Sequence, residues 1–207
     1  MIRSRCNLTA LVVVFSCAML MAANVLLAAP PKTLDNLQAA FNGESNANAK
    51  YLEFAKKADQ EGYAGVAVLF RAAAKAEEFH ARNHADVIKK MGATPKAEIK
   101  LPAIQPTADN LKAALEGETY ERDKMYPEFI AEAKTAGEKD AVRSFNFAVT
   151  AEGQHAKLYA DAGANLQAWK ATKKFMVCPV CGNTVATVDF AKCPVCFTPG
   201  DKFVPIV

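Results

Sequence analysis

The segment DNLQAAFNGE, residues 35–44, recurs as DNLKAALEGE, residues 109–118. Farther along the chain, the segments around Glu77 and Glu152 match in the same way, at a separation that is longer by one residue. Apolar residues in both copies recur at the three- and four-residue spacing of a helix. Glycines divide the copies into helices, which we expect at 34–61, 64–91, 108–136 and 138–163. The chain therefore contains two copies of a helical hairpin that differ in length by one residue.

A proline-rich segment at 93–106 separates the two copies. Its prolines exclude a helix, and it is long enough to cross a bundle and set the second hairpin beside the first. Four helices with one long crossover form the ferritin-like arrangement. We therefore expect an all-α ferritin-like four-helix bundle over residues 30–165. Gly43 and Gly117 fall inside its helices, where we expect another element to pack closely.

Acidic residues and histidines occupy equivalent positions in the two copies. Each copy has one Glu-x-x-His sequence, whose two side chains project from one face of a helix. Each copy also has a glutamate at the same place on its first helix. This is the ligand set of a carboxylate-bridged di-metal bundle, and imidazole favours transition metals over magnesium or calcium. The predicted ligands are Glu44, Glu77, His80, Glu118, Glu152 and His155.

Glu121 breaks the symmetry of the repeat, because its counterpart in the first copy is Ala47. It faces the same way as the ligand three residues before it and is a seventh potential ligand. Such an extra carboxylate, facing His80 across the site, would let one metal change its ligand with oxidation state. Tyr126, five residues after Glu121, is either a support for the site or a core aromatic. His84 has no histidine counterpart, and we expect it at the surface or beside the ligands.

Two Cys-x-x-Cys pairs stand eleven residues apart near the end of the chain. Four thiolates at this spacing predict a tetrahedral site for zinc or iron, between which the spacing does not decide. Disulfides are the alternative in an exported protein, but paired Cys-x-x-Cys sequences favour a metal. We expect a linker at 166–174 and a small metal-binding domain at 175–207, with the ligands Cys178, Cys181, Cys193 and Cys196.

Residues 1–29 have the pattern of an export signal or a membrane anchor. Arg3 and Arg5 precede 22 uncharged residues at 8–29, a stretch also long enough to span a bilayer. Cleavage, retention as an anchor and lipidation at Cys17 all remain open. Each places the body of the protein outside the cytoplasm, in the periplasm, and membrane contact is expected only through residues 8–29 if they are retained.

The overall composition narrows the class of protein. Hydrophobic residues make up 51% of the chain, which is typical of a globular protein and excludes a disordered one. The net charge is +3, with no basic stripe behind it, so we expect no nucleic-acid partner.

Residues 34–207 resemble the rubrerythrin family. The matching motifs are Gly43-Glu44-Ser45, both Glu-x-x-His pairs, Gly117-Glu118-x-x-Glu121, Met125-Tyr126-Pro127-Glu128-Phe129 and a rubredoxin-like cysteine segment. The resemblance implies a non-haem di-iron centre in the bundle and a single iron at the four cysteines. Glu77 and Glu152 would then bridge the irons, Glu44 would bind one iron, and Glu118 with His155 the other. Glu121 and His80 would exchange as ligands of the first iron.

The resemblance also implies a function. Members of the family reduce hydrogen peroxide to water, and the thiolate-bound iron relays electrons, commonly from the neighbouring subunit of a head-to-tail homodimer. We therefore expect a peroxidase of oxidative-stress defence, with Glu121, His80 and Tyr126 as its catalytic residues. Phe197 departs from the family, which often has glycine there. Export would remove the usual nicotinamide-linked electron supply, so we expect a periplasmic redox protein as donor.

Two other functions remain open. One is a ferritin-like protein that oxidises and binds iron, and the other is a structural zinc module that docks a partner. Colour distinguishes the four-cysteine alternatives, since zinc–thiolate sites are colourless and ferric ones are red.

Overall fold

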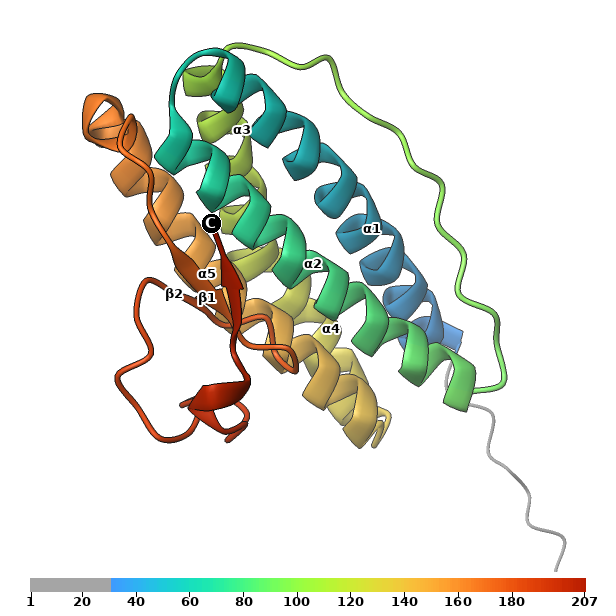
Figure 1. The fold of residues 1–207 in the computed structure, drawn as a ribbon. Helices are drawn as coiled ribbons and strands as arrows, with labels where there is room; N and C mark the ends of the chain where they lie inside the picture. The colour runs from blue at the N-terminus through green and yellow to red at the C-terminus, as the bar shows by residue number, and fades with distance from the viewer. Residues whose placement is uncertain (1–30) are drawn as a thin grey trace, which may run out of the picture.

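Four long helical segments lie side by side in the computed structural model, which describes residues 31–207 (Figure 1). They are α1 (Pro31–Gln60), α2 (Ala64–Lys90), a third segment, and α5 (Lys139–Ala164). The third segment joins α3 (Thr107–Tyr120) to α4 (Tyr126–Thr135) through a π-helical turn, η1 (Glu121–Met125). The predicted ferritin-like bundle is confirmed. The expectations for residues 1–29 lie outside the described residues; within 31–207, no helix is long and apolar enough to cross a membrane.

Both hairpins turn at a glycine with left-handed backbone geometry. Gly62 follows α1 with φ of +77°, and Gly137 follows α4 with φ of +75°. Their backbone N–H groups donate to equivalent carbonyls, those of Asp59 and Lys134. Residues with a Cβ avoid this geometry, so a glycine ends the first helix in each copy.

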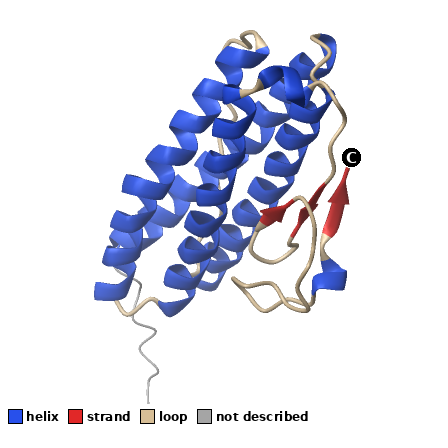
Figure 2. Cartoon of the chain, turned by 90° about the vertical axis from the view of Figure 1, so that its left-hand side faces the viewer, coloured by secondary structure: helices blue, strands red, loops and turns tan. Residues whose placement is uncertain are grey.

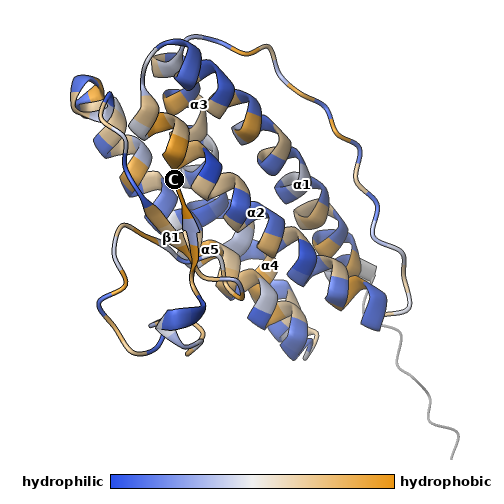
Figure 3. Cartoon of the chain, in the orientation of Figure 1, coloured by the Kyte–Doolittle hydropathy of each residue, from blue (hydrophilic) through white to orange (hydrophobic). Residues whose placement is uncertain are grey.

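The core repeats from one hairpin to the other. Figure 3 shows hydrophilic and hydrophobic stretches alternating along each helix, as expected when one face is buried. Three aromatic residues of the first copy have aromatic counterparts in the second: Tyr51, Phe54 and Phe70 match Tyr126, Phe129 and Phe145. The expectation of close packing at the mid-helix glycines is wrong. A Cβ on Gly43 would meet no atom within 4 Å, and one on Gly117 only the Lys50 amine at 3.9 Å.

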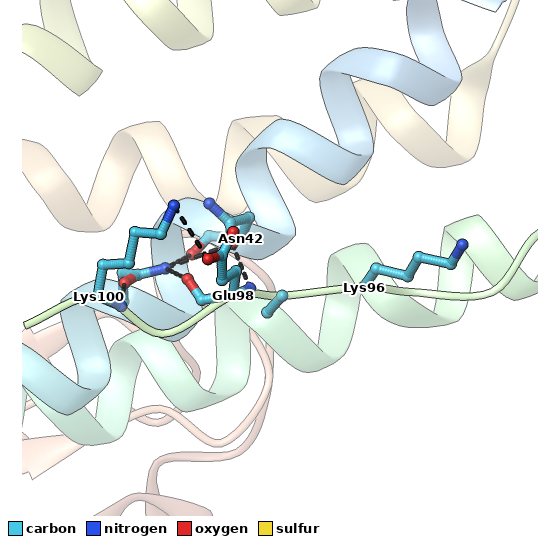
Figure 4. A pocket seen from close by; sticks show the side chains of 6 residues that line it. Asn42, Lys96, Glu98 and Lys100 are labelled. Atoms are coloured by element: carbon cyan, nitrogen blue, oxygen red, sulfur yellow. Dashed lines mark hydrogen bonds and ion pairs between the residues drawn. The ribbon is translucent and has the colours of Figure 1, made fainter.

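The crossover between α2 and α3 runs in extended form along α1 (Figures 1 and 4). Side-chain amides one helical turn apart on α1 bond to its backbone, so the connection is held without a secondary structure of its own. The amide oxygens of Gln38, Asn42 and Asn46 accept from the backbone N–H groups of Lys96, Glu98 and Lys100 at 3.1, 2.8 and 2.7 Å.

A small β module lies against α2 and α5 (Figures 1 and 2). Its antiparallel strands β1 (Phe175–Val177), β2 (Thr184–Val185) and β3 (Val204–Ile206) are ordered β2-β1-β3. The short helix η2 (Leu166–Trp169) leads into it, and η3 (Gly200–Lys202) precedes β3. A Cβ on Gly65 would lie 2.8 and 2.5 Å from the carbonyl oxygens of Trp169 and Ala171. Because Gly65 has no Cβ, the segment that connects α5 to the module can pack directly against α2, close to the point where the module begins.

Candidate metal centres

Six of the predicted ligands converge at the centre of the bundle. Each of their side chains is 1% exposed or less. They form two groups whose ligand atoms lie within 4.8 Å of one another, and both groups include Glu77 and Glu152. Two shared carboxylates between two groups are the arrangement of bridging ligands. The first group adds Glu44 and His80, and the second adds Glu118 and His155.

Each histidine turns Nδ1 towards the carboxylates. His80 Nδ1 lies 2.8 Å from Glu77 Oε2 and 3.3 Å from Glu152 Oε1. His155 Nδ1 lies 3.2 Å from Glu152 Oε2. The opposite ring nitrogens point to the module: His80 Nε2 is 3.1 Å from the Cys181 carbonyl oxygen, and His155 Nε2 is 3.1 Å from Thr184 Oγ1. Such outer hydrogen bonds orient a metal-binding imidazole.

The buried ligand residues have five carboxylate oxygens and one imidazole nitrogen that no protein group satisfies. A buried polar atom without a partner costs about 1–3 kcal/mol, and more when it is charged, so six together require compensation. Two transition-metal cations would supply both the partners and the positive charge, and the carboxylate and imidazole donors suit them. The six atoms are Glu44 Oε2, Glu77 Oε1, Glu118 Oε2, Glu152 Oε1, Glu152 Oε2 and His155 Nδ1. The residues therefore fit a di-metal centre.

Burial shifts the protonation equilibria of these groups. Burial raises the pKa of Glu118 to about 8 and, together with Glu77, holds that of Glu44 well above its usual range. Burial also acts against ionised Glu77, but the nearby His155 and the hydrogen-bonded His80 outweigh it and lower the pKa of that carboxyl. Glu77, one of the two carboxylates shared by both groups, is thus held in its charged form.

Two tyrosines bond to the outer carboxylates in a matching way. The Tyr51 hydroxyl donates to Glu118 Oε1 at 2.7 Å, and the Tyr126 hydroxyl donates to Glu44 Oε1. The sequence analysis singled out Tyr126 but not Tyr51. The repeat could have found it, because the two tyrosines occupy equivalent positions in the two copies.

Glu121 lies in η1 and belongs to neither group of ligand atoms. Its side chain is half-buried, and burial with the nearby Glu118 raises its pKa well above the usual range. The separation between the copies is one residue longer at Tyr126 than at Glu118, so the extra residue of the second copy falls in the π-helical turn. A π-helical turn accommodates one inserted residue within a helix. The structure thus brings six of the seven potential ligands together, with His80 in the site and Glu121 beside it.

His84 is buried, which excludes the surface position considered for it. Its Nδ1 lies 2.8 Å from Ser144 Oγ and its Nε2 lies 3.1 Å from Tyr126 Oη. Burial and the nearby His80 lower its pKa to about 3, so the ring is neutral at physiological pH. It therefore stands immediately behind the tyrosine that supports Glu44.

The four cysteines gather in the module. Their sulfur atoms lie within 4.8 Å of one another, with Cys178 and Cys196 at 3.5 Å and Cys181 and Cys193 at 3.6 Å. These separations exceed a disulfide bond and approach the ~3.8 Å edge of a tetrahedron with metal–sulfur bonds of about 2.3 Å. A hydrogen bond with Cys181 lowers the pKa of Cys178 to about 5, favouring a thiolate. The arrangement fits one zinc or iron ion.

Phe197 follows the last cysteine with φ of +62°, and its side chain is 72% exposed. Glycine adopts this left-handed geometry without strain, which accounts for the glycine expected at this position.

The first cysteine pair sits directly on α2 of the same chain. Arg82 donates to the Pro179 carbonyl, and Asn83 Nδ2 donates to the Val180 carbonyl at 2.7 Å. Gly182 has φ of +74°, and a Cβ there would collide with the His80 ring. The resemblance implied a relay from the neighbouring subunit. Here the chain's own module makes the contact with its own bundle.

Comparison with known proteins agrees with this geometry. The sequence model of the rubrerythrin family matches residues 35–163. Nigerythrin of Nitratidesulfovibrio vulgaris (strain Hildenborough) is 41% identical, over 83% of this chain and 85% of that protein. Rubrerythrin-2 of Clostridium acetobutylicum is 36% identical, over 83% and 95%. The structure of nigerythrin in its fully reduced, all-ferrous state matches with a TM-score of 0.78 at 39% identity, covering 84% of this chain and 86% of that one.

Proposed function

The chain belongs to the rubrerythrin family of di-iron oxidoreductases, and we propose that it reduces hydrogen peroxide to water in oxidative-stress defence. Its cofactors are a non-haem di-iron centre in the bundle and one iron or zinc ion at the four cysteines. The observation that carries the proposal is the hydrogen bond between His80 Nε2 and the Cys181 carbonyl. It joins a ligand residue of one metal site to a ligand residue of the other.

The buried residues define what the bundle contributes. Glu77 and Glu152 would bridge the metals, with Glu44 and His80 on one and Glu118 and His155 on the other. When bound, the reduced di-iron centre supplies the two electrons that one peroxide consumes as its O–O bond breaks and two protons are taken up. The Tyr51 and Tyr126 hydroxyls orient the outer carboxylates, and the packed aromatic core keeps bulk water from the site.

Glu121 and His80 are proposed to alternate as ligands of the same metal. His80 is in the site, while Glu121 stands beside it in the π-helical turn. A π-helical turn is a frequent feature of functional sites, because it interrupts the regular hydrogen bonding of the helix. Exchange of an imidazole for a carboxylate would offset the added charge of the oxidised metal.

The Cys181 residue offers a short electron path between the two sites. Its Sγ faces the other three sulfurs, and its carbonyl oxygen accepts from His80. We place the electron relay on this contact within one chain. A homodimer and a periplasmic redox protein as electron donor remain part of the proposal, as does the position outside the cytoplasm that residues 1–29 predict.

Single substitutions at the exchanging pair test the proposal. In Glu121→Ala and His80→Ala we expect iron to stay partly bound while peroxide turnover falls by about tenfold or more. Glu116→Ala is the matched control, because Glu116 is an exposed glutamate on α3. Turnover is measured with purified protein, an artificial electron donor and peroxide, beside iron content per chain. Wild-type turnover in both site variants would contradict the proposal, and iron loading far beyond the two sites would favour the iron-binding alternative.

A further inference from the structure

We infer that Ser144, His84 and Tyr126 form a directed proton path from the protein surface to Glu44, on the half of the metal site that contains His80. The inference rests on the proposed function, because reduction of peroxide to two waters takes up two protons in a buried site. The path adds Ser144 and His84 to the residues that serve the reaction.

Three consecutive hydrogen bonds define the path. Ser144 Oγ lies 2.8 Å from His84 Nδ1, His84 Nε2 lies 3.1 Å from Tyr126 Oη, and the Tyr126 hydroxyl donates to Glu44 Oε1. All four side chains are 4% exposed or less. The three hydrogen bonds are continuous, so the path needs no bridging water between these side chains.

The direction of donation follows from the inner end. Because Tyr126 donates its one proton to Glu44, its oxygen can only accept from His84, so Nε2 carries the proton of the neutral ring. His84 Nδ1 is then an acceptor, and the Ser144 hydroxyl must donate to it. Each of the three hydrogen bonds of the path is therefore donated in the direction of Glu44.

The outer end meets a surface cavity of about 450 Å³, which Ser144 lines. Its wall carries charged and polar groups and reaches the edge of the module, as shown by Asn83, Lys90, Asp140, Arg143 and Cys196. A cavity of this size that is open at the surface and has polar groups in its wall holds water. The free lone pairs of Ser144 Oγ can accept from that water while its proton stays on His84.

The other half of the site lacks this path. Tyr51 donates to Glu118 there, as Tyr126 does to Glu44, but the positions equivalent to His84 and Ser144 are Tyr159 and Leu69. Leu69 is fully buried, and the Tyr159 hydroxyl has no hydrogen-bond partner. Packing at these two positions is thus achieved without a polar pair. The histidine and the serine occur on one side of the site only. This asymmetry points to a chemical role.

Each passage moves one proton and no electrons. Tyr126 gives its proton to Glu44 Oε1, His84 Nε2 gives one to Tyr126, and Ser144 gives one to His84 Nδ1. Water in the cavity then restores the Ser144 proton. One passage therefore delivers one of the two protons to Glu44 and leaves His84 as the tautomer with its proton on Nδ1.

An isosteric pair of variants at Ser144 tests the path. Ser144→Val and Ser144→Thr have the same shape, but only threonine keeps the hydroxyl. We expect Ser144→Val to slow the reaction of the reduced iron-loaded chain with peroxide by about tenfold or more and to raise its solvent isotope effect, while Ser144→Thr stays near wild type. Iron content is expected to be equal in all of them. His84→Tyr, which copies the other half, is expected to behave like Ser144→Val, and Tyr159→Phe is the matched control on the opposite half.

Long-range ¹H–¹⁵N spectra of the zinc-loaded, full-length chain give a readout that is independent of turnover. The path predicts a neutral His84 with its proton on Nε2. A proton on Nδ1, or wild-type rates and isotope effects in both Ser144→Val and His84→Tyr, would overturn the path while leaving peroxide reduction intact. Failure of the proposed function itself is distinguishable, because wild-type protein would then also react slowly with peroxide, and the path would fall with it.

Discussion

The Tyr51 hydroxyl donates to Glu118 Oε1 across the bundle at 2.7 Å, and the same bond recurs between Tyr126 and Glu44. Each tyrosine belongs to one copy of the repeat, and its glutamate belongs to the other. The two bonds therefore tie the hairpins together at the metal site. The second copy has one residue more between its glutamate and its tyrosine than the first copy has, and η1 absorbs the difference.

Removal of one such hydroxyl is expected to weaken the bundle. Tyr51→Phe leaves the Glu118 carboxyl, already short of partners, with one fewer hydrogen bond. We expect the free energy of unfolding to fall by about 1–2 kcal/mol. The measurement is urea unfolding of samples matched for metal content. Tyr120→Phe, at an exposed tyrosine on α3, is the control and is expected to change stability by less than about 0.5 kcal/mol. Equal stability in both variants would contradict the structural role of the bond.

Gly182→Ala is expected to separate the module from the bundle. The new Cβ would collide with the His80 ring, and the positive φ adds strain. Electron transfer from the four-cysteine site should slow by about tenfold or more, as followed by reoxidation of its iron after peroxide is added. The absorption spectrum checks that the cysteine site itself is intact. Gly43→Ala is the control, because its Cβ would meet no atom within 4 Å. Unchanged transfer in Gly182→Ala would show that the contact is not the electron path.

Glu61 provides a pH-dependent contribution to stability. Its Oε2 accepts from the Thr107 N–H at 2.8 Å, at the start of α3, and this bond with the nearby Lys57 lowers its pKa to about 2. Because the folded-state pKa lies below the unfolded value of 4.5, the contribution is complete above pH 4.5 and is lost as pH falls towards 2. Glu61→Ala is therefore expected to destabilise the chain by about 1 kcal/mol at pH 7, as loss of a helix cap does.

Urea unfolding of wild type and Glu61→Ala at pH 7, 4.5 and 3 measures this contribution. The difference in unfolding free energy should be largest at pH 7 and should narrow below pH 4.5. A difference that stays constant over this range would mean that the ionised carboxylate is not the stabilising form.

The repeat made most of the bundle predictable from the sequence. Helical periodicity and the paired Glu-x-x-His sequences are local patterns, so they indicated both the four helices and the six residues that converge. The one-residue difference between the copies was also visible. It can be placed between Glu118 and Tyr126 by aligning the two copies, but no propensity shows that the chain absorbs it as a π-helical turn rather than in a loop.

Long-range packing determined the rest. No local pattern shows that His84 is buried against Ser144, because the two residues are 60 positions apart. The position of the module against its own bundle likewise depends on Gly65 and Gly182. The importance of these glycines is apparent only when the neighbouring atoms are known. The glycines at 43 and 117 show the converse, since a repeated glycine inside a helix predicted close packing that does not occur.

Rapid mixing of the chemically reduced protein with peroxide or with oxygen, in separate experiments without other oxidants, distinguishes peroxide reduction from iron oxidation by oxygen. The signal is the return of the red ferric–thiolate absorption of the four-cysteine site. Peroxide reduction through connected metal sites predicts a fast return with peroxide and a slow return with oxygen. A faster return with oxygen, or a lack of red colour in the oxidised protein before it is reduced, would contradict peroxide reduction through connected metal sites.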